Sequence, residues 1–234
     1  MHYEVMGNGQ TSVVLLHGWG ARGRAMLPLA GAFDKCKLVV PDLWGFGNSP
    51  HPDCALTLDD YVRSVADLII SECNGRAVVV GHSFGGRIAT KLAVLWPQLV
   101  QGIVLVNAAG IRPRLGVKRW LLQKRYKWLK ARGRDVSRYG SADYCALKGA
   151  IRRTFVSVVN EDLRPVLGKV ACPALILSGE LDRDVLPRCG RIMARKIRNS
   201  EFVVIRSAGH FCYVDAPNVV RREIQGWFKR EICQ

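Results

Sequence analysis

The sequence predicts an α/β fold in which helices cover both faces of a mostly parallel central sheet. Short apolar runs of strand length alternate with segments of helical periodicity along most of the chain. The 234 residues, of which 49% are hydrophobic, are enough for one such domain with a full core and too few for two. The clearest strand-to-helix junction lies at residues 78–86, where an apolar run ends in Gly-His-Ser-Phe-Gly-Gly.

The predicted strands are short apolar runs, several of them rich in valine, isoleucine and leucine and bounded by turn residues. They lie at 2–6, 12–16, 37–40, 78–80, 102–106, 174–177 and 201–205. The first alternates weakly between apolar and polar residues, so we expect it at an edge of the sheet. The runs at 12–16 and 78–80 are more uniformly apolar, which is typical of strands buried on both faces.

The predicted helices fall between these strands. The segment 26–33 is compatible with a helix, and Thr57-Leu58-Asp59-Asp60 forms a capping box before the next one. A third helix spans 87–96 and stops at Pro97, because proline cannot continue a helix. A fourth spans 191–197. A last helix, opened by a proline, is expected to bury Val220, Ile224, Trp227 and Phe228.

Ser83 lies where a strand turns sharply into a helix, and this position suits a nucleophile. Such a turn strains the backbone, so small residues are needed on either side, and Gly81 and Gly85 meet that need. The serine hydroxyl would project above the sheet edge at a helix N-terminus. There, backbone N–H groups and the helix dipole favour developing negative charge.

This strand–turn–helix motif resembles the nucleophile elbow of the α/β-hydrolase superfamily, and the resemblance extends over nearly the whole chain. In that family the loop after an early strand supplies one donor to an oxyanion hole. By resemblance, that donor is the backbone N–H of Trp19 in His17-Gly18-Trp19-Gly20, and the second is the backbone N–H of Phe84. We expect His17 to brace this loop by hydrogen bonding.

The catalytic acid and base are predicted downstream. The strand at 102–106 ends at Asn107, and no Asp or Glu follows until Asp135. The turn Gly-Glu-Leu-Asp-Arg-Asp-Val-Leu-Pro resembles the family's acid turn and identifies Asp182 as the acid, with Asp184 as the alternative. Gly209-His210 after the last strand resembles the family's histidine loop. The order Ser83, Asp182, His210 is the order expected for this fold.

The segment 111–170 interrupts the alternation of strands and helices and is strongly basic. It contains sixteen Lys and Arg against four Asp and Glu, a net charge of +12 out of +16 for the chain. The apolar spacing predicts two helices. One has Val117, Trp120, Leu121 and Trp128 on its apolar face, and the apolar face of the second is formed by Leu147, Ile151, Phe155 and Val158.

In the α/β-hydrolase fold such an insertion is a cap, here placed after the sixth strand. The expected organisation is a core of 1–110 and 171–234 with a basic helical cap at 111–170. Residues 160–167 are assigned either to the cap or to a core helix. The basic surface fits an acidic carrier protein or an anionic surface, with a solvated face as the alternative. The first basic helix is also compatible with lying on a membrane surface.

Composition and motif content narrow the remaining classes. The eight cysteines are scattered without a Cys-x-x-Cys, so we expect reduced thiols and a cytoplasmic location. We find no signal-peptide pattern and no apolar run of membrane-spanning length. His and Cys spacings match no zinc pattern, and no nucleotide-binding signature occurs, so neither a metal, a cofactor nor specific nucleic-acid recognition is expected.

The sequence therefore predicts a serine hydrolase that cleaves a small-molecule carboxylic ester through an acyl-enzyme intermediate. The His-Gly-Trp-Gly loop and compact size are similar to the family of pimeloyl-acyl-carrier-protein methyl ester esterases, so a carrier-protein-linked ester or thioester is an alternative substrate. A carbon–carbon bond hydrolase and a non-catalytic ligand-binding homologue also remain open. Lactonases and perhydrolases share the same serine chemistry.

Overall fold

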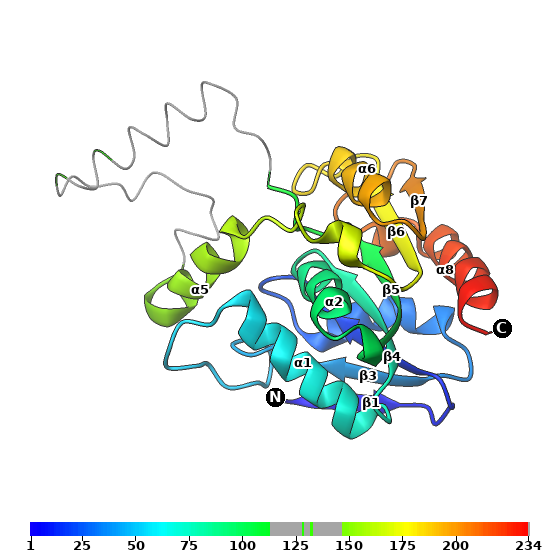
Figure 1. Ribbon diagram of the computed structural model, residues 1–234, viewed down its shortest axis with the longest axis horizontal. Coiled ribbons are helices and arrows are strands. Elements are labelled where there is room, and N and C mark those ends of the chain that lie inside the picture. The colour runs from blue at the N-terminus through cyan, green and yellow to red at the C-terminus, as the bar shows by residue number, and fades with distance from the viewer. Residues whose placement is uncertain (113–127, 129–131, 133–146, 234) are drawn as a thin grey trace.

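The computed structural model describes residues 1–112 and 147–233, together with Trp128 and Arg132 (Figure 1). Its centre is a seven-stranded sheet in the order β1-β3-β2-β4-β5-β6-β7. β1 pairs antiparallel with β3, and every other pair is parallel. The strands are β1 (Tyr3–Met6), β2 (Ser12–Leu16), β3 (Lys37–Pro41), β4 (Ala77–His82), β5 (Val100–Val106), β6 (Ala174–Gly179) and β7 (Ser200–Ile205).

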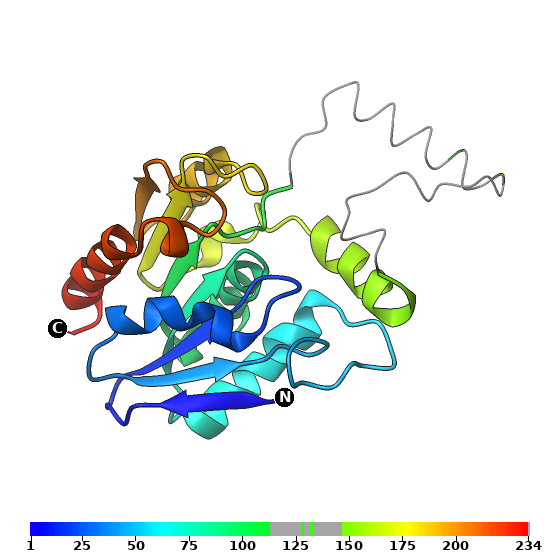
Figure 2. The same cartoon turned by 180° about the vertical axis from the view of Figure 1, so that it is seen from behind.

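The central strands are continuously apolar because both faces of the sheet are covered. Every residue of β2, β4 and β6 is buried, whereas the edge strand β1 alternates between exposed and half-buried residues. One face packs against α1 (Leu58–Glu72), α2 (Phe84–Leu95) and α6 (Pro187–Lys196). The other packs against η1 (Gly23–Ala32), α7 (Cys212–Asp215) and α8 (Pro217–Glu231) (Figures 1 and 2).

Local sequence signals determine where several helices begin. The predicted capping box is confirmed: Thr57 Oγ1 accepts from the backbone N–H of Asp60, whose carboxylate accepts from the N–H of Thr57. The predicted helix at 26–33 is instead the 3₁₀ helix η1, which contains Pro28. α6 begins four residues earlier than predicted, with Pro187 in its first turn. Proline is tolerated there because the N–H groups of the first turn have no acceptor within the helix.

The long insertion follows β5, the fifth strand among the described residues, so the predicted count of six is corrected by one. Its position directly after 102–106 is as predicted. The second predicted helix is α5 (Gly149–Asn160), with Leu147 just before it. Most of the first predicted helix, including Val117, Trp120 and Leu121, lies outside the described residues.

Residues 160–167 form no helix that returns to the sheet. α5 ends at Asn160, a non-helical stretch follows, and the 3₁₀ helix η3 (Leu167–Lys169) leads into β6. Pro165 lies within this stretch, and a proline disfavours helical geometry in the residue before it. The alternative that placed a core helix here is therefore wrong.

A buried arginine of α2 connects α5 to the core by hydrogen bonds. Arg87 is 6% exposed, and its Nη1 donates to the carbonyls of Val158 and Glu161 at 2.9 and 2.8 Å. Val158 lies in the last turn of α5 and Glu161 is the residue directly after it, where carbonyls lack the regular hydrogen bonds of the helix interior. Nearer its middle, Thr154 Oγ1 accepts from the backbone N–H of Leu56 at 2.8 Å. Both contacts hold α5 beside the carboxyl end of the sheet (Figure 1).

No helix among the described residues is long and apolar enough to cross a membrane.

Candidate active site

Ser83 has the strained backbone that the glycine pattern predicts. Its φ is +48° and its ψ −105°, and it lies between β4 and the first residue of α2. A Cβ on Gly81 would lie 2.3 Å from the Gly85 carbonyl oxygen, and one on Gly85 would lie 2.2 Å from that of Leu16. Both glycines are therefore required by close backbone approach around the serine.

Hydrogen bonds fix this turn against the neighbouring strand. The backbone N–H of Ser83 donates to the carbonyl of Val106 at 3.1 Å, and the Ser83 carbonyl accepts from the N–H groups of Gly86 and Ala109. Residues that follow β4 and β5 are thus tied together at the same edge of the sheet. This is the edge where parallel α/β sheets form their ligand sites.

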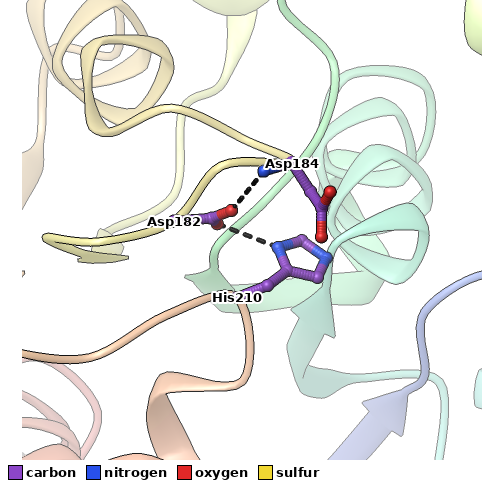
Figure 3. Close-up of side chains that lie close together, drawn as sticks. All are labelled: Asp182, Asp184 and His210. Carbon is purple, nitrogen blue, oxygen red and sulfur yellow. Dashed lines mark hydrogen bonds and ion pairs between the residues drawn. The ribbon is translucent and has the colours of Figure 1, made fainter.

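Asp182 and His210 are brought together from the loops after β6 and β7. His210 Nδ1 lies 2.8 Å from Asp182 Oδ2. Figure 3 marks this contact with a dashed line. The other carboxylate oxygen, Oδ1, accepts from the backbone N–H groups of Asp184 and Val185 at 2.8 and 2.9 Å. Asp182 is 2% exposed. Burial alone would raise the pKa of this carboxyl, but the hydrogen bonds, that of His210 foremost, lower it below its usual value.

Asp184, the alternative acid, has a different environment. It is exposed, and its own backbone N–H supports Asp182. Its carboxylate lies beside the His210 ring in Figure 3, and the three residues offer ligand atoms within 4.8 Å of one another. However, the four hydrogen bonds that Asp182 accepts, from His210, Asn107 and two backbone N–H groups, occupy the lone pairs that a cation would need. The arrangement therefore fits an acid–histidine pair better than a metal site.

His82 connects the serine turn to the histidine loop. Its Nε2 lies 2.9 Å from the carbonyl oxygen of His210, to which it donates, and the two imidazole centroids are 4.8 Å apart. His82 is 2% exposed. Since His82 precedes Ser83 directly, this contact places His210 next to the serine turn.

The buried His82 predicts a pH-dependent stability. Burial lowers its pKa to about 4, so the native state holds a neutral imidazole where the unfolded chain holds a protonated one below about pH 6.5. The unfolded state then binds more protons, and stability falls as the pH drops from 6.5 to 4, by about 3 kcal/mol in total. Chemical denaturation across this range should show a shallower fall for His82→Asn than for wild type. The exposed His51→Asn should keep the wild-type slope, and equal slopes in both variants would contradict the prediction.

The Ser83 hydroxyl makes no hydrogen bond within the described part of the chain, to His210 or to any other group. With Nδ1 of His210 bound to Asp182, its Nε2 is the ring nitrogen left to face a reacting group. Catalytic hydrogen bonds are often long without substrate and tighten in the complex. The structure thus brings two of the three predicted residues into contact and places the third on the adjoining turn.

The loop after β2 is braced as predicted. The backbone N–H of Leu43 donates to His17 Nε2 at 3.0 Å, and Nδ1 donates to the Gly18 carbonyl at 2.8 Å. Burial lowers the pKa of His17, which keeps the ring neutral and able to accept from Leu43. The Trp19 indole lies edge-on to Phe84 and to Phe155 of α5, with centroids 5.3 and 5.1 Å apart.

The two backbone N–H groups assigned to the oxyanion hole are unoccupied by protein acceptors. Neither the N–H of Trp19 nor that of Phe84 donates to another group among residues 1–112 and 147–233. Phe84 is the first residue of α2, where an N–H has no intrahelical partner. Gly18, the residue before Trp19, lies close to the serine turn: a Cβ added to it would be 3.5 Å from Ser83 Cβ. The loop after β2 therefore lies against the serine.

Sequence reasoning missed one polar residue of this site. Asn107, at the end of β5, is fully buried and donates from Nδ2 to Asp182 Oδ2 and to the Gly209 carbonyl. The family resemblance predicts only an acid at this position, and an asparagine does not fit that prediction. Its one sequence signal is a polar residue directly after a buried strand, at the edge where the other site residues gather.

Comparisons with known proteins identify the family and the fold. A model of the alpha/beta hydrolase family matches residues 13–223. The pimeloyl-[acyl-carrier protein] methyl ester esterase of Pectobacterium carotovorum is 27% identical, over 96% of this chain and 96% of that protein. The protein of the same name from Shewanella woodyi is 38% identical over 109 residues, which cover 47% of this chain and only 40% of that protein.

Solved structures share the fold at low sequence identity. A thermophilic esterase from Thermogutta terrifontis superposes with a TM-score of 0.76 at 23% identity, covering 98% of this chain and 93% of that one. An esterase from Exiguobacterium antarcticum gives 0.78 at 20% identity, covering 97% and 95%. With the family match over most of the chain, and the predicted similarity to the pimeloyl-carrier esterases confirmed, the chain belongs to the alpha/beta hydrolase family.

Proposed function

We propose that this protein is a serine hydrolase that cleaves carboxylic esters through Ser83, His210 and Asp182. The observation that carries the proposal is the Asp182–His210 hydrogen bond, formed beside the turn on which Ser83 has φ +48°. A buried acid oriented onto a histidine, next to a half-buried serine at a helix N-terminus, is the arrangement that activates a hydroxyl.

The reaction follows from these positions. Ser83 Oγ attacks the ester carbonyl carbon while His210 Nε2 takes the hydroxyl proton. Asp182, held ionised by its hydrogen bonds, stabilises the imidazolium and fixes the tautomer with its proton on Nδ1. The tetrahedral oxyanion would accept hydrogen bonds from the N–H groups of Trp19 and Phe84.

The acyl-enzyme is then formed and hydrolysed by the same groups. Collapse of the intermediate breaks the bond to the alcohol, which leaves with the proton from His210. A water molecule attacks the Ser83 ester, and His210 takes its proton and returns one to Oγ. The products are an alcohol, a carboxylic acid and free enzyme, so no redox partner or cofactor is needed.

The surroundings of Ser83 favour an apolar acyl or alcohol group. Trp19, Phe84 and Phe155 form edge-on aromatic contacts between the loop after β2 and α5. Two apolar side chains next to the proposed acid and base are exposed: Phe211, beside His210, is 49% exposed, and Leu181, beside Asp182, is 60% exposed. Apolar side chains lining a polar reaction centre are typical of small-molecule sites. We therefore propose that α5 belongs to a cap that covers the substrate.

A hydrolysis series with p-nitrophenyl esters, from acetate to long acyl chains, tests the function. The proposal predicts turnover that depends on Ser83 and has an optimum at one acyl length. No turnover of any ester by the folded protein would contradict the esterase assignment. It would favour a carrier-protein-dependent esterase, a carbon–carbon bond hydrolase or a ligand-binding homologue.

A carrier-linked ester is a second candidate substrate, favoured by two observations. Relatives that align over most of this chain are named for a pimeloyl ester on an acyl carrier protein. Residues 111–170 carry a net charge of +12, which would attract an acidic protein. For such a substrate, kcat/KM should fall steeply between about 50 and 200 mM salt, while hydrolysis of a neutral p-nitrophenyl ester stays nearly constant. Equal salt dependence for both would contradict carrier docking.

We also propose a cytoplasmic location. All seven cysteines among the described residues are free thiols, which fits a reducing compartment.

A further inference from the structure

Asn107 lies at the centre of the edge where the site residues meet. It follows β5, which lies between β4 with the serine turn and β6 with the acid turn. Its backbone N–H donates to the carbonyl of Leu177 in β6 at 2.8 Å. Its φ of +46° is a left-handed conformation that asparagine tolerates better than most residues.

The side-chain amide joins the acid loop to the histidine loop. Both of its N–H bonds are used, one to Asp182 Oδ2 and one to the carbonyl of Gly209 at 3.3 Å. Asp182 Oδ2 is also the oxygen that His210 Nδ1 contacts. The Asn107 amide thus binds both the carboxylate oxygen that contacts His210 and the carbonyl of the residue immediately before His210.

This arrangement leaves the other end of the amide unsatisfied. Asn107 Oδ1 is buried and accepts no hydrogen bond from any group in the described part of the chain. A buried polar atom without a partner destabilises the fold, and an apolar side chain of similar volume would avoid that cost. The hydrogen bonds that the two Nδ2–H groups donate therefore account for an asparagine at this position better than packing does.

We propose that Asn107 is a positioning residue of the active site, which holds Asp182 Oδ2 in line with His210 Nδ1 and fixes the spacing of the two loops. This inference rests on the proposed hydrolase function. The side-chain N–H groups of Asn107 bond Asp182 and Gly209, so the residue acts through the acid–histidine pair.

The groups that face this pair determine what a charge at position 107 would do. The buried His82 and Cys212 are both neutral at pH 7, with pKa values of about 4 and about 12 that result from burial. Asp184 is an exposed carboxyl beside His210. A second carboxyl in contact with Asp182 would therefore add negative charge beside the imidazolium of His210. That charge favours the protonated form of the histidine.

Two variants and a matched control test the proposal. Asn107→Ala is expected to lower kcat by about 10–100-fold with KM nearly unchanged, because small displacements of catalytic groups cost that much. Asn107→Asp is expected to move the acid limb of the kcat/KM profile up by about one pH unit or more. Asn74→Ala places the same substitution at an exposed residue with φ +51°, and should keep wild-type kcat.

The outcomes separate positioning from simple stability. If both Asn107 variants fold and keep the wild-type kcat and pH profile, the proposal is wrong. It is also wrong if neither variant folds, since the residue would then serve the fold. Fluorophosphonate labelling of Ser83 in the wild-type protein distinguishes a failure of the Asn107 proposal from a failure of the proposed hydrolase function. An unlabelled, inactive wild type would overturn the function, whereas a labelled, active wild type with unaffected variants would overturn only the role of Asn107.

Discussion

Replacing Ser83 by alanine is expected to lower kcat for ester hydrolysis by on the order of 10⁶-fold, because no other group takes its place as nucleophile. The fold should survive, since the Ser83 hydroxyl makes no hydrogen bond among the described residues and only the oxygen atom is removed. The measurement is the initial rate on the best p-nitrophenyl ester, at equal concentrations of folded protein.

The matched control for this variant is Ser207→Ala. Ser207 is exposed and has φ +55°, so alanine there meets the same backbone strain as at Ser83. Ser207→Ala should retain activity within about twofold and lose similar stability. Residual turnover of Ser83→Ala near the wild-type rate would mean that another group is the nucleophile.

The second large effect is expected at Asp182. Asp182→Asn should lower kcat by on the order of 10⁴-fold, because an amide can present its N–H to His210 Nδ1 and select the wrong tautomer. Asp184→Asn should change kcat by less than about tenfold, since Asp184 is exposed and the bond to His210 Nδ1 is made by Asp182.

The comparison of these two variants decides between the two candidate acids. Both are the same isosteric substitution, two residues apart, and both remove one negative charge near His210. A larger loss in Asp184→Asn than in Asp182→Asn would show that the acid had been assigned to the wrong carboxylate. Circular dichroism of each variant checks that the fold is retained.

The parts of this structure that were predictable from sequence depend on local geometry. A strand that turns into a helix around a strained serine needs glycine on either side, and Gly81 and Gly85 occupy these positions. Thr57 and Asp60 cap a helix through hydrogen bonds between residues only three positions apart. The loop residues Asp182 and His210 follow strands that the apolar pattern makes evident. Since parallel strands end at one edge of the sheet, placing them there also places the site.

The parts that were not predictable depend on contacts between distant segments. Asn107 meets Asp182 across 75 residues of chain, and Arg87 meets the carbonyls of α5 across more than 70. Neither contact leaves a periodic or spacing signal. The 3₁₀ helix η1 and the non-helical stretch before η3 each contain a proline, Pro28 and Pro165, and the apolar pattern does not show how a proline changes the local backbone.

The central claim is that Ser83 is a nucleophile activated by His210, and mass spectrometry after treatment with a fluorophosphonate tests it directly. This account predicts one label per chain, on the peptide that contains Ser83, and a labelling rate that falls sharply in His210→Gln. A label on another residue, or no label on the folded wild-type protein, would contradict it.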